Sequence, residues 1–143
     1  MRTRDKLRRV VPAGTNMYKY VVNYDNGQFN FAIIKLLTLE PGIVANNPND
    51  EFKICRVPKV YVTDVVAATD SGIDTWYSTF DATFIYRIKE IAVARDYNGY
   101  IWNTCGAGIN CFATVKETLA YINLDIGKRL EVKKDTLCEV LTK

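Results

Sequence analysis

The sequence predicts an α+β fold: a mostly antiparallel β-sheet, arranged as a sandwich or a partly open barrel, with one main α-helix near residues 114–123. Segments rich in aromatic and β-branched residues, which favour strands, recur between turn residues from 18 to 94. The Asn26-Gly27 pair is typical of the two-residue turn of a β-hairpin. Thr114 stands three residues before Glu117, as in the capping box that begins a helix.

Length and composition predict one globular domain. The chain has 143 residues, 48% of them hydrophobic and 24% charged, and a chain of this size can bury its own core without cross-links. No apolar run approaches the length that spans a bilayer, and the N-terminus lacks the apolar region of a secretory signal. We therefore expect a flexible basic arm and linker over residues 1–16, a single globular domain over residues 17–143, no membrane contact and no secretion.

Positive charge is concentrated in the first nine residues. They carry a net charge of +4, against +3 for the whole chain, so the rest of the chain is close to neutral. Such an arm is either a solvated chain end or a contact for DNA phosphates or for an acidic protein surface. The cations concerned are Arg2, Arg4, Lys6, Arg8 and Arg9.

The N-terminal part of the domain is expected to begin with a hairpin. Pro12 and Gly14 mark residues 10–16 as a linker. Residues 18–24 and 29–37 follow as the two antiparallel strands that flank the Asn-Gly turn.

Loops, more strands and a further loop are expected next. A short apolar piece at 43–44 lies among turn residues, and strands are expected at 52–57 and 60–66, with Pro58 marking a break or an edge. Three cations here fit an edge strand that discourages sheet-to-sheet association: Lys53, Arg56 and Lys59.

The middle of the chain gives a weaker signal. Residues 67–81 predict a loop anchored by aromatic side chains, and their carboxylates lack the spacing of a calcium loop. Residues 83–94 alternate between apolar and charged and predict a strand with a bend near Glu90. The anchoring aromatic residues are Trp76, Tyr77 and Phe80.

Residues 101–122 carry the most specific pattern. Gly106 and Gly108 permit a sharp turn into a short strand at 109–112. The capped helix follows, and the tail predicts one or two further strands, at 130–132 and 137–141, or a short terminal helix. The apolar face of the capped helix is Val115, Leu119 and Ile122.

The sequence offers no catalytic residue, metal site or cofactor site. The chain contains no histidine, which removes the commonest general base and every Ser-His or Cys-His nucleophile. The cysteines form no C-x-x-C pair, so buried reduced thiols are expected. They are Cys55, Cys105, Cys111 and Cys138.

The pattern W-x-x-C-x-x-G-I-x-x-F-x-T-x-x-E-x-x-x-Y, from Trp102 to Tyr121, resembles a small domain of unknown function encoded by giant double-stranded DNA viruses and phages, in some proteins attached to pentapeptide repeats. The resemblance covers roughly residues 17–122. It implies a non-enzymatic viral protein in the virion or the host-cell cytoplasm that contacts other viral proteins and forms a homo-oligomer, most simply a dimer. In this pattern Asn110 stands where histidine is usual.

A second resemblance belongs to another class of protein. Gly106 to Phe112, followed by a helix that ends in Ala120-Tyr121, is similar to the nicotinamide-cradling segment of ADP-ribosyltransferases. Such enzymes also use a histidine, absent here, so the resemblance implies at most a degenerate nucleotide-binding domain. Alternatively, these residues are simply core and turn. The candidate pocket or motif residues are Trp102, Cys105, Gly106, Gly108, Asn110 and Tyr121.

Overall fold

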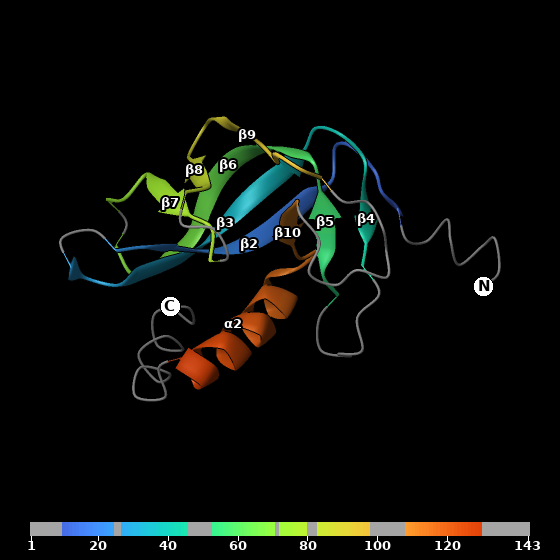
Figure 1. Ribbon diagram of the computed structural model, residues 1–143. Helices are drawn as coiled ribbons and strands as arrows, with labels where there is room; N and C mark the ends of the chain where they lie inside the picture. The colour runs from blue at the N-terminus through green and yellow to red at the C-terminus, as the bar shows by residue number, and fades with distance from the viewer. Residues whose placement is uncertain are drawn as a thin grey trace.

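The computed structural model describes residues 10–24, 27–45, 53–70, 72–79, 83–97 and 108–129, with side chains described as far as residue 124. Within these residues the predicted fold class is confirmed: two antiparallel sheets and one helix form a β-sandwich that is not closed into a barrel (Figure 1). In this part of the chain no helix is long and apolar enough to cross a membrane. The predicted strands after residue 129 lie outside the described residues.

A six-stranded sheet forms the larger layer. Its order is β8 (Ile85–Arg87), β7 (Thr75–Tyr77), β2 (Asn16–Asn23), β3 (Asn30–Thr38), β6 (Lys59–Ala68) and β9 (Ile91–Val93). The predicted hairpin is confirmed, because β2 and β3 pair along their whole length. Gly27 has a φ of +75°, which glycine adopts readily, while Asn26 lies outside the described residues.

A four-stranded sheet forms the second layer. Its order is β1 (Val10–Val11), β4 (Gly42–Val44), β5 (Cys55–Val57) and β10 (Ile109–Cys111). Val10 and Val11 belong to the segment expected to be a linker, yet they pair with β4, and Val11 is buried. The turn at Pro12 to Thr15 therefore connects β1 to β2 and does not prevent a strand.

Two strand expectations need correction. The expected loop at 67–81 contains β7, and Trp76 on that strand is buried, which confirms its anchoring role. The bend expected near Glu90 is a turn between β8 and β9, where Lys89 has a φ of +70°.

The proposed edge-strand role of the cations was wrong. β5 lies between β4 and β10, and β6 lies between β3 and β9, so neither strand is an edge. Pro58 marks the point at which the chain passes from one sheet to the other, which confirms the predicted break. Arg56 is fully buried and cannot guard an exposed edge.

Helix α2 (Val115–Arg129) begins at the predicted cap and extends beyond the expected end. The Thr114 hydroxyl accepts a hydrogen bond from the Glu117 N–H at 3.1 Å. One oxygen of the Glu117 carboxylate accepts from the Thr114 hydroxyl at 3.1 Å, and the other accepts from the Lys53 N–H at 2.7 Å. The cap therefore also ties the helix to the residues that lead into β5.

The two layers and the helix enclose two hydrophobic cores. The larger core lies between the sheets and includes Met17, Val21 and Trp76. The smaller core lies where α2 crosses the outer face of β2 and β3 (Figure 1). There the predicted helix face, Val115, Leu119 and Ile122, packs with Tyr20, Val22, Phe31 and Ile33.

Thr114→Ala is expected to lower the free energy of unfolding by about 1 kcal/mol, because the Glu117 N–H loses its acceptor at the helix start. Thr114→Ser, which keeps a hydroxyl, is the matched control and should stay close to wild type. Urea unfolding followed by circular dichroism measures both changes. Equal stability of the alanine and serine variants would contradict the role of the hydroxyl.

Candidate functional site

The predicted site residues do not form one site. The five arm cations, Trp102, Cys105 and Gly106 lie outside the described residues. Gly108 and Asn110 lie together at the start of β10. Tyr121 lies in the smaller core instead, with its ring centroid 6.4 Å from that of Tyr20 and 5.2 Å from that of Phe112.

Gly108 makes room for Arg56. The glycine has a φ of +145°, and a Cβ placed there would lie 2.6 Å from Cγ of Arg56. Arg56 pairs with Asn110 across β5 and β10, and its Nε donates to Asn110 Oδ1 at 3.4 Å. The Tyr97 hydroxyl donates to the backbone oxygen of Arg56 at 3.3 Å. The space that this glycine leaves open is therefore occupied by an arginine of the same chain.

Lys19 approaches Asn110 from the six-stranded sheet. It is 4% exposed, and its Nζ donates to the Asn110 carbonyl at 2.6 Å and lies 5.7 Å from the centre of the Tyr86 ring. Burial lowers the pKa of Lys19 from 10.5 to about 8. We call the group formed by Lys19, Arg56 and Asn110 the Asn110 junction.

The course of the strands explains why a lysine stands here. β10 joins β2 through one bridge, in which Tyr18 and Phe112 exchange backbone hydrogen bonds of 2.7 and 2.8 Å. In a continued antiparallel ladder the Asn110 carbonyl would accept from the backbone of Tyr20. The strands diverge after the bridge, and the Lys19 ammonium supplies the missing donor. The junction thus satisfies a buried carbonyl at the point where the two sheets separate.

The nearby thiols are not activated. Cys55 and Cys111 are buried and free. Burial raises the pKa of Cys55 to about 12, with a smaller contribution from the Glu117 carboxylate, and burial raises the pKa of Cys111 as well, with a smaller contribution from the neighbouring Cys55. Nucleophilic cysteines need the opposite shift, because the thiolate is the reactive form. Within the described ranges no three His, Cys, Asp or Glu side chains gather as metal ligands.

The sequence interpretation missed Lys19 and misassigned Arg56. Lys19 lies on β2 between Met17 and Val21, two buried members of the larger core. Because strand side chains alternate between faces, this spacing places the lysine on the inward face and could have revealed it. Arg56 gave no such signal, since its burial depends on Tyr97 and Gly108, which are distant in sequence.

In the described residues the fold and the Asn110 junction define a small two-sheet β-sandwich domain covered by helix α2. Residues 9–118 match the model of a family of unknown function (DUF5758), and the chain belongs to this family. The match confirms the predicted kinship with a domain of unknown function. No curated protein and no solved structure matches the chain.

Proposed function

We propose that this chain is a non-enzymatic viral protein that associates with the virus particle through protein–protein contacts and forms a homodimer. An exposed apolar surface on the outer face of the six-stranded sheet carries the proposal. We call this surface the β9 patch; Ile91 and Val93 are its exposed members, and the half-buried Leu37 and Tyr61 continue it across the sheet.

The β9 patch is a continuous row across three strands. Leu37 on β3 pairs with Tyr61 on β6, which pairs with Ile91 on β9. Ile91 and Val93 are 57% and 55% exposed, and both flank the buried Ala92. Helix α2 covers the part of this face formed by Tyr20, Val22, Phe31 and Ile33, while Ile91 and Val93 stay exposed in the described part of the chain. Exposed apolar surface of this kind is typical of a protein–protein contact.

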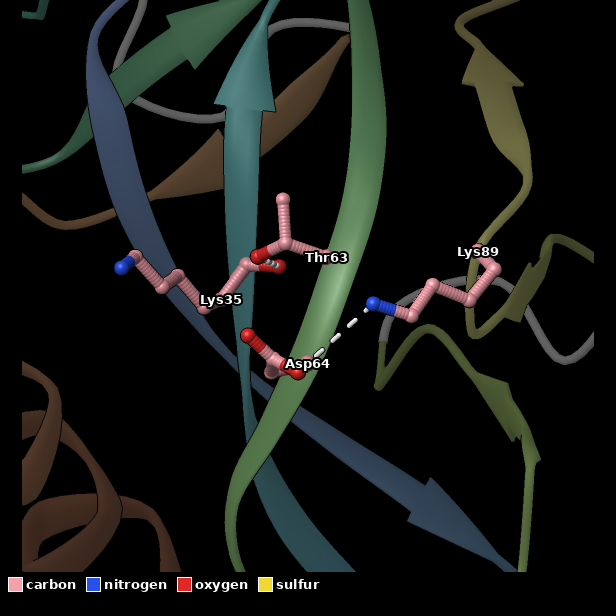
Figure 2. Close-up of polar contacts among 4 residues, drawn as sticks. All are labelled: Lys35, Thr63, Asp64 and Lys89. Carbon is pink, nitrogen blue, oxygen red and sulfur yellow. Dashed lines mark hydrogen bonds and ion pairs between the residues drawn. The ribbon is translucent and has the colours of Figure 1, made fainter.

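The patch is bordered by charged residues at both ends and is apolar between them. Lys59 lies opposite Val93 at one end of the patch. Toward the other end the carboxylates of Asp64 and Glu90 are offset by two lysines, since Asp64 forms a 4.0 Å ion pair with Lys89 and is the ladder partner of Lys35 (Figure 2). A two-fold axis through the patch would bring Ile91 and Val93 of one copy against the same side chains of the other, which is the self-complementary contact of an isologous interface.

Other observations support the remaining parts of the proposal. The raised thiol pKa values at Cys55 and Cys111 argue against a cysteine nucleophile. Arg56 fills the space beside Gly108, which argues against a nucleotide there. The sequence resemblance supports viral origin and particle association, and mass spectrometry of purified particles tests it. Absence of the chain from particles would overturn that part alone.

Ile91→Lys and Val93→Lys should each weaken self-association by about tenfold or more, because a charge would be buried in the apolar interface. Sedimentation velocity over a range of concentrations measures the dimer dissociation constant. Val66→Lys is the matched control, since Val66 is a 45% exposed strand valine outside the patch. A wild-type chain that stays monomeric, or equal weakening by all three substitutions, would overturn the dimer.

A further inference from the structure

Cys55 and Cys111 face each other in the larger core. They are direct partners in the antiparallel pair of β5 and β10, and both are buried members of the same hydrophobic cluster. Partners in a ladder point their side chains to the same face of the sheet. The two sulfurs therefore project from neighbouring backbones into the same region.

The ladder fixes how far apart the two backbones lie. The N–H and carbonyl of Phe112 point toward Tyr18 on β2. Successive residues of a strand direct these groups to opposite sides, so the N–H and carbonyl of Cys111 point toward β5. Hydrogen-bonded partners of this type have Cα atoms about 5.5 Å apart, inside the range of about 4.4–6.8 Å found for disulfides. Their Cβ atoms, which in hydrogen-bonded pairs lie toward the wider end of the usual range of about 4.5–5.5 Å, would have to approach by roughly 1–2 Å.

We propose that Cys55 and Cys111 form a reversible cross-strand disulfide when the chain meets a low-molecular-weight disulfide such as oxidised glutathione. One cysteine, as its thiolate, attacks the small disulfide, forms a mixed disulfide and releases one small thiolate. The second thiolate attacks the cysteine sulfur of the mixed disulfide and releases the other. The two protein thiols together lose two protons and two electrons, and the oxidant becomes two thiols.

The link would join β5 to the strand that carries Asn110, beside the contact from Lys19. Burial keeps both thiols protonated, so exchange in the folded chain requires β5 and β10 to separate transiently. Closing the disulfide requires the two Cβ atoms to move toward each other, and this movement strains the bond. A strained disulfide is easier to reduce than a relaxed one. The pair lies on the inner face of its sheet, so the inference is independent of the β9 patch.

In a refolding experiment the oxidant can reach both thiols before they are buried. The experiment therefore tests directly whether Cys55 and Cys111 lie close enough to form a disulfide. The full-length chain with Cys105→Ser and Cys138→Ser is unfolded, reduced, and diluted into buffer containing reduced and oxidised glutathione. We expect a folded chain lighter by two hydrogen atoms, whose peptides link Cys55 to Cys111, with cooperative thermal unfolding that shifts downward on reduction. Adding Cys55→Ser provides the matched control and should abolish the link.

Several outcomes would overturn the proposal. They are two free thiols in the refolded chain, glutathione held as a stable mixed disulfide, links between chains, or a linked chain without cooperative unfolding. If the double variant does not refold, peptide mapping of the wild-type chain decides between a Cys55–Cys111 link and any pairing that includes Cys105 or Cys138.

Discussion

Gly108→Ala should lower the free energy of unfolding by about 2–4 kcal/mol, one of the two largest effects expected in this chain. The φ of +145° is unfavourable for any residue with a Cβ. The added methyl would also lie 2.6 Å from Arg56 Cγ and 3.1 Å from Tyr97 Cδ1. Arg56 is fully buried, so its side chain has little room to move aside. Urea unfolding measures the change.

Gly14→Ala is the matched control for the cost of backbone conformation. Gly14 also has a positive φ, of +83°, but a Cβ there would meet no atom within 4 Å. This substitution should cost only about 1 kcal/mol, from the backbone alone. Equal losses in the two variants would show that Arg56 does not pack against Gly108, and the Asn110 junction would then need revision.

Local chemistry was enough to predict the main elements of this fold. The β2–β3 hairpin follows from the Asn-Gly turn and its flanking strands, and helix α2 follows from the Thr114 cap. Both signals act over a few residues, so no tertiary contact is needed to read them. The position of Trp76 in the core could be predicted because a large aromatic side chain is seldom left in water.

Features that depend on distant contacts were not predictable in this way. β1 is a strand only because β4 pairs with it, although Pro12 and Gly14 suggest a linker. Arg56 is buried only because β10 and Tyr97 cover it. The glycine pattern correctly indicated that Gly108 has an unusual backbone conformation. The sequence alone could not show that the space beside Gly108 is filled by Arg56 and not by a ligand.

The buried ammonium of Lys19 should make stability depend on pH. The pKa is about 8 in the folded chain and 10.5 in the unfolded chain, so between these values the unfolded state binds more protons. The free energy of unfolding therefore rises with pH across this window. At pH 7 the lowered pKa costs about 3 kcal/mol, and the cost disappears above the unfolded pKa.

Comparison with Lys19→Met isolates this effect, since methionine keeps most of the volume but does not titrate. Between pH 7 and 9 the wild type should gain about 1 kcal/mol relative to the variant. Cys111 faces the ammonium, but burial raises its pKa and that of Cys55, so both thiols stay protonated in the folded chain over this range.

The matched control is Lys116→Met on the exposed surface of α2, which removes the same charge without emptying the junction. Urea unfolding of the three proteins at several pH values gives the comparison. Parallel curves for wild type and Lys19→Met would mean that the ammonium is solvated, and its bond to the Asn110 carbonyl would then not hold the two sheets together. If the free energy of unfolding rises with pH in the wild type and in Lys116→Met but not in Lys19→Met, the ammonium is buried where β2 and β10 diverge.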